Sequence, residues 1–369
     1  MTDPGGLRVV ELDPWSDPRW ERFVSGRPDR LLSHHPAWLR VLEAEYGRRP
    51  TALACEDAGG ELRGVLPLLS TRGLPFTGQI GRRRLSSLPR TPLAGPLALD
   101  RDARAALVGA ALERVRARDG LTLELKAQGR ELDGLADGVV ALPWRLTYVV
   151  ELPERPEELR FGSSRNHSAI KRAVGKAARA GVHVRPAETE NELRAWYPLY
   201  LATMREHALP PRSLRFFRAL WHHLQPLGFM RLLLAEQVSG GHRRLLAGSV
   251  LFPFGETVSY AFNGRRADAL PLRPNDATHW QAMETACREG YRRYDFGEVS
   301  AGNAGLTQFK RKWVHEPQQL YRYYYPAPER PEAAESEGSG PVGRLARATW
   351  RRLPLPVTAR FGDWLYYFL

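Results

Sequence analysis

The segment that decides the fold lies at residues 274–317, PNDATHWQAMETACREGYRRYDFGEVSAGNAGLTQFKRKWVHEP. Residues 275–290 predict a helix that ends at Gly290, and YRRYDFGE predicts the strand after it. Three strands precede this helix, at FMRLLLAEQ, RRLLAGSVLFPFG and ETVSYAFNG. The order strand–strand–strand–helix–strand is typical of an α+β domain whose helices cover both faces of a mixed sheet.

The same half of the chain begins with a basic helix, SSRNHSAIKRAVGKAARAG, at residues 163–181. The strand VHVRPA and two helices, NELRAWYPLYLATMREH and SLRFFRALWHHLQPLG, connect it to the three strands. This order of elements resembles that of an acetyltransferase-type α+β domain. The resemblance implies that two central strands separate and expose backbone N–H and C=O groups, to which an acyl thioester or ester can add as an extra strand. We therefore expect the working cleft where two central strands separate.

An internal comparison indicates a duplicated domain. Residues 52–70, ALACEDAGGELRGVLPLLS, and residues 232–252, LLLAEQVSGGHRRLLAGSVLF, share an apolar strand, a Gly-Gly turn and a strand with a glycine before its apolar run. A spacing of about 180 residues is too long for a solenoid repeat and fits a domain duplication. The organisation that we predict is listed by range: domains at 1–150 and 151–327, a flexible Pro/Glu/Ser/Gly linker at 328–340, and a basic, aromatic tail at 341–369.

The composition is that of a globular protein in a reducing compartment. The 369 residues are 43% hydrophobic and 26% charged, which is enough for a core in each of two domains. We find no 18-residue apolar run and expect no signal peptide. Cys55 and Cys287 lie in apolar surroundings without a second ligand nearby, so neither a disulfide framework nor a zinc site is expected.

The net charge of +13 predicts an anionic partner, such as RNA, a nucleotide-linked substrate or acidic lipid headgroups. The alternative is that GC-rich coding DNA raised the arginine content without a role in binding. Lysine is rare, with five residues among 54 basic ones, and four of the five lie in 163–181 or 274–317. A lysine among so many arginines indicates a compact point charge. The tail 341–369 either contacts a membrane surface or packs back onto a domain.

Two segments carry a resemblance to a known family. They are the basic helix 163–181 and the ordered patterns PN…W, DFG and GLTQFKRKW of residues 274–317. This order resembles the second half of Fem-type aminoacyltransferases and CelD-like acetyltransferases of the GNAT superfamily, and HHPAWLRVL, GGELRGVLPLL and SSLPRTPLAGPLALD are similar to the first half. The resemblance covers about residues 10–325. It implies two tandem GNAT-like domains, each a mixed sheet flanked by helices, and transfer of an activated acyl or aminoacyl group to an amine or hydroxyl.

Lys310 and Asp295 are the predicted catalytic residues. Acyl transfer needs a group that stabilises the oxyanion, and Lys310 falls on the lysine that Fem-type enzymes are thought to use. A surface lysine in the run KRK is the alternative. Asp295 ends a strand before a Phe-Gly turn, where it would orient the donor or bond the local backbone. Because the chain has no Gly-x-Ser-x-Gly elbow or Cys-His pair, we expect direct attack on the donor without a covalent enzyme intermediate.

The predicted substrate-binding residues lie on the basic helix and around the third strand. Four of them lie on the helix: Arg165, Asn166, Lys171 and Lys176. Arg165, Arg172 and Lys176 share one helix face at i, i+7 and i+11, which forms either an anion-facing stripe or a solvated face. Tyr260 and Asn263, on the strand, would contact the acceptor at the cleft, although Asn263 also suits a turn. Asn275, in the PN pattern, completes the set.

The sequence leaves the donor open. The stretch GRRADALPLRPNDATHW, after the third strand, lacks the Gln/Arg-x-x-Gly-x-Gly/Ala loop with which acetyl-CoA enzymes bind pyrophosphate. Acyl-CoA and aminoacyl-tRNA are therefore both candidate donor substrates, and neither a tightly bound cofactor nor a metal is expected.

The expected acceptor is a small molecule or a biosynthetic precursor. Such a precursor would belong to the cell envelope, to an exopolysaccharide or to a specialised metabolite. The expected location is the bacterial cytoplasm, with contact to the inner face of the membrane through the tail as an addition. The alternative function is a non-catalytic adaptor that keeps the fold and binds anionic surfaces. Sequence-specific DNA binding is not expected, because no helix-turn-helix or zinc-finger pattern occurs.

Overall fold

The computed structural model describes residues 6–72, 83–239, 242–300, 302–314, 316–328 and 341–368. The chain forms two compact units, which divide between Arg145 and Leu146 and again between Gln318 and Gln319. The described tail through Asp363 groups with the second unit. Apart from its first residue, the predicted linker 328–340 lies outside the described residues. The domain boundaries at residues 150 and 327 stay predictions.

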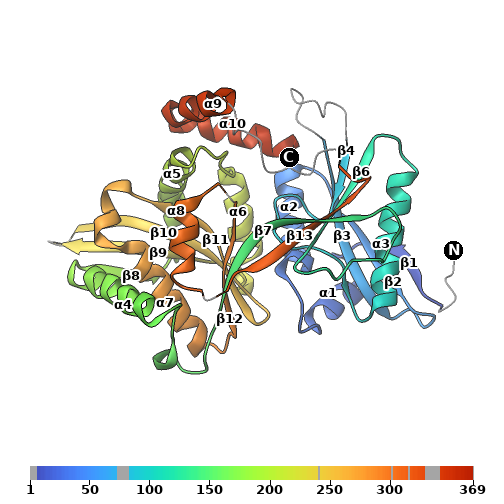
Figure 1. The fold of residues 1–369 in the computed structure, drawn as a ribbon, viewed down its shortest axis with the longest axis horizontal. Helices are drawn as coiled ribbons and strands as arrows, with labels where there is room; N and C mark the ends of the chain where they lie inside the picture. The colour runs from blue at the N-terminus through green and yellow to red at the C-terminus, as the bar shows by residue number, and fades with distance from the viewer. Residues whose placement is uncertain are drawn as a thin grey trace. The chain divides into compact units, whose positions relative to one another are not determined.

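Unit 1 is built on a mixed sheet with the strand order β1-β2-β3-β4-β6-β13 (Figure 1). The bounds are β1 (Arg8–Glu11), β2 (Thr51–Glu56), β3 (Leu62–Arg72), β4 (Arg83–Ser86), β6 (Leu121–Ala127) and β13 (Gln318–Tyr325). The pair β4–β6 is parallel, the other pairs are antiparallel, and the short β5 (Leu97–Ala98) adds to β3. The helices are α1 (Pro18–Ser25), α2 (Pro36–Tyr46) and α3 (Arg101–Arg116), with a 3-10 turn, η1, at Leu32–His34.

Helix α3 packs on the apolar face of this sheet. Its N-terminus is capped by Asp100, whose carboxylate accepts a hydrogen bond from the backbone N–H of Ala103 at 2.8 Å. Leu107 on the helix is fully buried in one core with Leu123 of β6 and Tyr323 of β13. Each such side chain contributes about 1.5–3 kcal/mol by leaving water, so this contact holds the helix to the strands.

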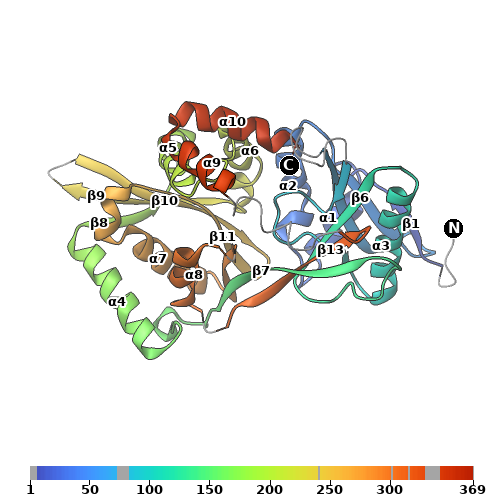
Figure 2. The ribbon, with the colours of Figure 1, turned by 45° about the horizontal axis from the view of Figure 1, so that its top comes forward.

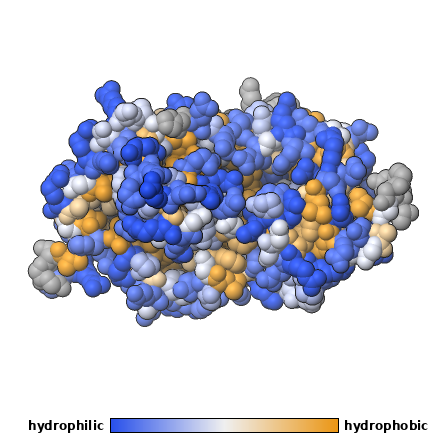
Figure 3. All heavy atoms as spheres, turned by 90° about the horizontal axis from the view of Figure 1, so that it is seen from below, coloured by the Kyte–Doolittle hydropathy of each residue, from blue (hydrophilic) through white to orange (hydrophobic). Residues whose placement is uncertain are grey.

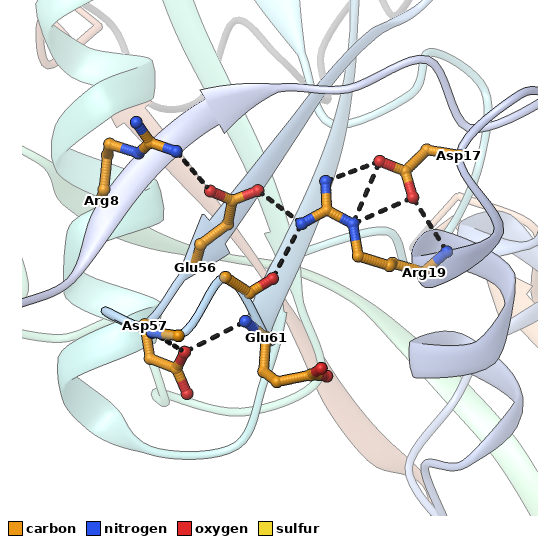
Figure 4. Close-up of polar contacts among 8 residues, drawn as sticks. Arg8, Asp17, Arg19, Glu56, Asp57 and Glu61 are labelled. Atoms are coloured by element: carbon orange, nitrogen blue, oxygen red, sulfur yellow. Dashed lines mark hydrogen bonds and ion pairs between the residues drawn. The ribbon is translucent and has the colours of Figure 1, made fainter.

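A charged network ties the first elements of unit 1 to the sheet (Figure 4). Glu56 of β2 is 4% exposed and accepts hydrogen bonds from Arg8 of β1 and Arg19 of α1, each at 2.9 Å. Arg19 also donates to the Asp17 carboxylate and, at 2.8 Å, to the carbonyl of Gly60. The nearly buried carboxylate is therefore balanced by two guanidinium groups, which a buried charge requires.

Unit 2 contains a second mixed sheet, with the strand order β7-β12-β11-β10-β9-β8. The bounds are β7 (Val140–Glu151), β8 (Val182–Pro186), β9 (Arg231–Ser239), β10 (His242–Phe254), β11 (Thr257–Arg265) and β12 (Arg293–Val299). The pair β11–β12 is parallel and the other pairs are antiparallel. The predicted fold class, α+β with mixed sheets flanked by helices, is confirmed.

Helices cover both faces of the second sheet. Figures 1 and 2 show α4 and α7 on one face and α5 and α6 on the other. The bounds are α4 (Ser164–Arg179), α5 (Glu190–Glu206), α6 (Leu214–His223), α7 (Pro274–Arg288) and α8 (Ala304–Arg311), with 3-10 turns η2 (Pro156–Glu158), η3 (Gln225–Leu227) and η4 (Ala267–Leu272). The core under α4 and α7 includes Tyr148, Met283 and Phe296, all within 1% of complete burial.

Helix α5 lies directly on the backbone of β10 and β11, and two glycines make this possible. Trp196 donates from its indole nitrogen to the carbonyl of Gly248 at 2.8 Å. A Cβ atom at Gly264 would lie 2.4 Å from the backbone nitrogen of Tyr200. Only glycine leaves room for this approach, because it has no Cβ.

The tail forms two helices, α9 (Pro341–Arg352) and α10 (Leu355–Phe368). Arg205 of α5 donates to the carbonyl of Leu353 at 3.2 Å, and Arg351 of α9 donates to the carbonyl of Glu206 at 3.1 Å. Thr358 of α10 is fully buried. Of the two alternatives for the tail, contact with a membrane surface or packing onto a domain, these contacts agree with packing onto a domain. Across the described ranges, no helix is long and apolar enough to cross a membrane.

The face shown in Figure 3 is dominated by hydrophilic residues, and its hydrophobic residues form separate groups. Among the described residues, three of the exposed large apolar side chains lie along α10, at Val357, Phe361 and Trp364, and others come from scattered positions such as Leu209 and Leu227. Single exposed apolar side chains are normal for a globular protein and do not mark a partner.

Candidate functional site

The parallel strands β11 and β12 pair over only three positions and then separate. The pairs are Thr257–Arg293, Val258–Tyr294 and Ser259–Asp295. Beyond them, β12 pairs with β7 at Glu298 and Thr147, while β11 stays with β10 as far as Arg265. We call this region, residues 259–265 of β11 and 295–299 of β12, the strand fork. It is the separation of central strands that the sequence predicts.

A β-bulge lies in β11 just inside the strand fork. Tyr260 pairs with Leu251 of β10 and Phe262 pairs with Val250, so the register skips Ala261. Ala261 is the exposed residue of this strand. A bulge leaves the extra residue outside the ladder and re-aims its neighbours. Backbone polar groups at Ala261 are therefore free of the regular pairing at the point where β12 has already turned away.

Asp295 is the last residue of β12 that pairs with β11. Its Oδ1 atom accepts hydrogen bonds from the Thr147 hydroxyl and from the backbone N–H of Gly297, both at 2.8 Å. Gly297 has φ of +73°, which an L side chain rarely adopts. Burial raises the pKa of Asp295, and the bonds from Gly297 and Thr147 partly offset this. The contact to Gly297 is the local backbone bond expected of a turn-forming aspartate, and the catalytic role of Asp295 stays a prediction.

Lys310 reaches the strand fork from helix α8. Its side chain is buried, with the residue 3% exposed, and Nζ donates to the carbonyls of Gly297 at 2.9 Å and Glu298 at 3.1 Å. Burial lowers the pKa of Lys310 to about 8, and the carboxylates of Glu298 and Asp295 partly counter this. The alternative, that Lys310 is a surface lysine in the run KRK, is wrong. Its neighbours Phe309 and Trp313 pack in the core, so this side of α8 faces inward.

The fork is narrow at the level of Lys310. A Cβ atom built on Gly297 would lie 3.4 Å from the carbonyl oxygen of Tyr260 and 3.8 Å from Nζ of Lys310. Gly297 therefore lies between the ammonium group and the strand β11. The Lys310 ammonium, bonded to the carbonyls of β12, and the Tyr260 carbonyl of β11 thus lie on two sides of Gly297.

Behind the fork, Tyr260 packs against the buried His279 of α7. Their ring centroids are 4.7 Å apart, and Nδ1 of His279 lies 2.9 Å from the hydroxyl of Tyr294. Burial lowers the pKa of His279 to about 3, helped by the positive charges of Lys312 and Lys310. Burial raises the pKa of Tyr260 to about 12. Both side chains are therefore neutral at pH 7.

Asn263 and Asn275, two of the predicted substrate-binding residues, are in contact. The Nδ2 atom of Asn263 lies 3.3 Å from Oδ1 of Asn275 and 3.3 Å from the hydroxyl of Ser249. The contact joins the strand β11 to the first turn of α7, so the polar groups converge beyond the bulge. This arrangement is suited to orienting an amide or hydroxyl of a substrate.

Sequence reasoning missed an ion pair at the same end of α7. Asp276 is 4% exposed and accepts a hydrogen bond from Nζ of Lys312, which lies 4.4 Å from the centre of the Phe309 ring. A carboxylate in the first turn of a helix is favoured by the helix dipole. The signal was present in the sequence, since Lys312 is one of the rare lysines and Asp276 belongs to the PN pattern. His279, one turn later in the same segment, was missed as well.

The basic residues of α4 lie apart from this group. Arg165, Lys171 and Lys176 are exposed on α4, and the Ser163 hydroxyl caps the helix by accepting a hydrogen bond from the backbone N–H of Asn166. Lys171 lines a small cavity of about 130 Å³ together with Trp280 of α7. In the described part of the chain, no hydrogen bond or ion pair joins these side chains to the residues of the fork. Their binding role stays a prediction.

Residues 164–311, from α4 to α8, match the family described as an acetyltransferase (GNAT) domain. Residues 164–311 form a GNAT-type acetyltransferase domain. The match contains the strand fork and Lys310, so the family resemblance predicted from the sequence is confirmed. The domain makes the chain an acyltransferase, which is the enzyme class that the sequence predicts.

Solved structures share the fold over most of the chain. FemX is 16% identical with a TM-score of 0.67, and the match covers 86% of this chain and 98% of that one. The C-terminal domain of a putative lysylphosphatidylglycerol synthetase from Agrobacterium fabrum is 14% identical with a TM-score of 0.57, covering 86% and 93%. The Saccharomyces cerevisiae N-myristoyltransferase with bound myristoyl-CoA is 11% identical with a TM-score of 0.51, covering 90% and 81%. No curated protein matches the chain.

Proposed function

We propose that the protein transfers an acyl or aminoacyl group from an activated donor to an amine or hydroxyl, and that the reaction takes place at the strand fork. The observation that carries this proposal is the end of parallel pairing at Ser259 and Asp295, directly before the bulge at Ala261. An extended donor can add to the exposed backbone of β11 as a short extra strand. The GNAT-type domain supports the same chemistry.

The proposed step is a direct displacement. The acceptor nitrogen or oxygen attacks the carbonyl carbon of the donor and forms the new C–N or C–O bond. The C–S bond of a thioester, or the C–O bond of an aminoacyl ester, breaks, and the proton of the acceptor passes to the leaving group. The Lys310 ammonium stabilises the oxyanion, and Asp295 holds the turn at Gly297 whose carbonyl positions that ammonium.

The placement of the reaction at the strand fork also suggests which residues bind the two substrates. We assign Tyr260, Asn263 and Asn275 to the acceptor, because they lie on or beside β11 beyond the bulge. The exposed basic side chains of α4 are assigned to the anionic part of the donor: Arg165, Lys171 and Lys176, with Asn166 beside them. Positive charge is what a CoA phosphate or a tRNA backbone would require.

The donor is proposed as an acyl-CoA or an aminoacyl-tRNA. One structural neighbour binds myristoyl-CoA, which supports the former, and the name of another, a lysylphosphatidylglycerol synthetase, points to an envelope lipid as the acceptor. We therefore propose an envelope-related acceptor, in a bacterial cytoplasm at the inner face of the membrane. The net charge of +13 supports attraction to anionic lipids or to tRNA.

Thermal stabilisation by candidate donors is the first experiment. The melting temperature is measured with CoA, acetyl-CoA and deacylated tRNA, each at low and moderate salt. A ligand at about 100 times its Kd stabilises the fold by roughly 2.7 kcal/mol, which is easily measured. A shift with CoA that survives added salt supports a thioester donor. A shift with tRNA alone, still present at moderate salt, supports the aminoacyl ester.

Transfer itself is then followed by mass spectrometry of the product. We expect Lys310→Met to lower the rate by roughly 10²–10³-fold, the usual loss when one oxyanion donor is removed. Arg118→Met is the matched control, because Arg118 is exposed in unit 1 and also loses one positive charge. Equal rates in Lys310→Met and wild type would exclude Lys310 from the reaction.

A further inference from the structure

A pocket of about 670 Å³ lies where the tail meets the second unit. Figures 1 and 2 show α9 beside α5 there. The wall comes from α5, the end of β11, the turn η4 and α9: Ala202, Arg205, Glu206, Arg265, Ala267 and Arg351. The tail therefore completes a cavity that the GNAT-type domain alone leaves open on one side.

The charged groups of the pocket do not balance. Glu206 is the one carboxylate among the lining residues, and its Oε1 accepts a hydrogen bond from Nη2 of Arg265 at 2.8 Å. Arg205 and Arg351 donate instead to main-chain carbonyls, those of Leu353 and Glu206. Three guanidinium groups against one carboxylate leave two positive charges in the wall. Carbonyl dipoles orient these groups but do not neutralise them.

One donor in the wall is also unsatisfied. The side chain of Arg265 is 12% exposed, and its Nη1 atom is buried without a hydrogen-bond partner among the described residues. Buried polar groups in folded proteins are normally paired, so Arg265, which lines the pocket, keeps a guanidinium donor that is still without an acceptor. Loss of a proton cannot remove this unpaired donor of Arg265, because arginine stays charged in proteins.

We propose that this pocket binds a phosphate monoester. Two unbalanced positive charges match the charge of about −1.5 to −2 that a phosphate monoester carries at neutral pH. Planar guanidinium groups bind phosphate oxygens through paired N–H donors, and the three arginines approach from three different elements. A carboxylate ligand would leave one charge uncompensated. The ligand is either a soluble phosphate compound or a lipid with a terminal phosphate.

The proposal is independent of the acyl-transfer reaction, and a direct binding measurement tests it. Titration calorimetry of the full chain with inorganic phosphate at pH 8, where the dianion prevails, and at fixed low ionic strength gives the Kd. We expect Arg351→Gln to raise the Kd at least tenfold. Arg352→Gln is the matched control, since this exposed neighbour on the same helix is no part of the wall and carries the same charge. Its Kd should stay within twofold of wild type.

A second variant separates binding from a loosened tail. Arg205→Gln changes the wall on α5 and should raise the Kd to a similar degree, while thermal melting reports whether each variant is folded. Lys310→Met should bind phosphate like wild type, so failure of the acyl-transfer proposal would leave this result unaffected. Equal weakening by Arg351→Gln and Arg352→Gln would mean that only the net charge matters, and the pocket proposal would be wrong.

Vesicles distinguish the two sources of the phosphate. Co-sedimentation is compared for vesicles of phosphatidylcholine with and without phosphatidic acid, whose headgroup is a phosphate monoester. Binding to phosphatidic acid that Arg351→Gln abolishes and Arg352→Gln preserves assigns the pocket to a lipid. Binding of free phosphate without vesicle binding assigns it to a soluble compound. If wild type binds neither phosphate nor phosphatidic acid, the proposal is overturned.

Discussion

Replacing Lys310 with methionine should change how the stability of the protein depends on pH. Lys310 is buried at the strand fork, and its pKa falls from 10.5 to about 8. Between these two values the unfolded chain binds a proton at this lysine that the folded chain has released. The free energy of unfolding of the wild type therefore rises with pH through this window. Below pH 8 the cost of burying the ammonium is fully present.

The size of the effect follows from the two pKa values. One pH unit of difference is worth 1.36 kcal/mol, so burial of the ammonium costs roughly 3 kcal/mol at pH 7. Integrated from pH 7 to pH 10, the wild type should gain roughly 2–3 kcal/mol that Lys310→Met does not gain. Other titrating groups are common to both proteins and cancel in the difference. The absolute stability of the wild type also includes the two hydrogen bonds from Lys310 to β12, which methionine cannot make. The comparison therefore uses the change with pH.

Urea unfolding at pH 7, 8, 9 and 10 measures this difference. Lys176→Met is the control, because Lys176 is exposed on α4, and its profile should run parallel to that of the wild type. Parallel profiles for Lys310→Met and wild type would refute the argument, since they would mean that burial does not perturb Lys310. If the argument holds, Lys310 is mainly protonated at pH 7, and the transfer rate should fall as pH rises through about 8.

Three further predictions concern other parts of the fold. Lys126 of β6 is buried, and burial lowers its pKa to about 7. Lys126→Met should therefore be more stabilising at pH 6 than at pH 9, by roughly 3 kcal/mol. Urea unfolding at both pH values measures this difference. Gly264→Ala should destabilise by about 1–3 kcal/mol because its Cβ atom meets the backbone of α5 at 2.4 Å. Gly109→Ala, in open space on α3, should instead stabilise by about 0.5–1 kcal/mol, and a shared sign in thermal melting would contradict the packing argument. Thr147→Val removes the bond to Asp295 and should cost about 1 kcal/mol in the same assay, whereas an unchanged melting temperature would mean that the bond contributes nothing.

Local pattern was enough to predict many elements of this fold. The basic helix expected at 163–181 is α4, Ser164–Arg179, and the helix expected at 275–290 is α7, Pro274–Arg288. Gly290, the predicted stop of the second of these helices, adopts the left-handed conformation that glycine favours, with φ of +83°. These features depend on residues within one or two turns, which a sequence displays directly.

Strand pairing over long distances could not be predicted in the same way. β13 pairs with β6 in unit 1, at Tyr321–Ala127 for example, almost 200 residues away in the chain. The predicted second domain, 151–327, includes this strand, and the sequence indicates no pairing partner for it. Nothing in the alternation of YRYYYP distinguishes one sheet edge from another, because the choice depends on which edge the earlier strands leave open.

The same division between local and long-range information applies to the site. The rarity of lysine and the FK pattern singled out Lys310, yet its two carbonyl partners belong to β12 and are set by the turn at Gly297. The basic helix was equally conspicuous in the sequence, but its exposed lysines lie outside the fork because only Ile170 and Ala177 of α4 are buried. A cation becomes a candidate for catalysis through the backbone that it faces. That backbone is set by the turn at Gly297 and by the end of the pairing between β11 and β12 at Asp295, which is why the strand fork had to be observed.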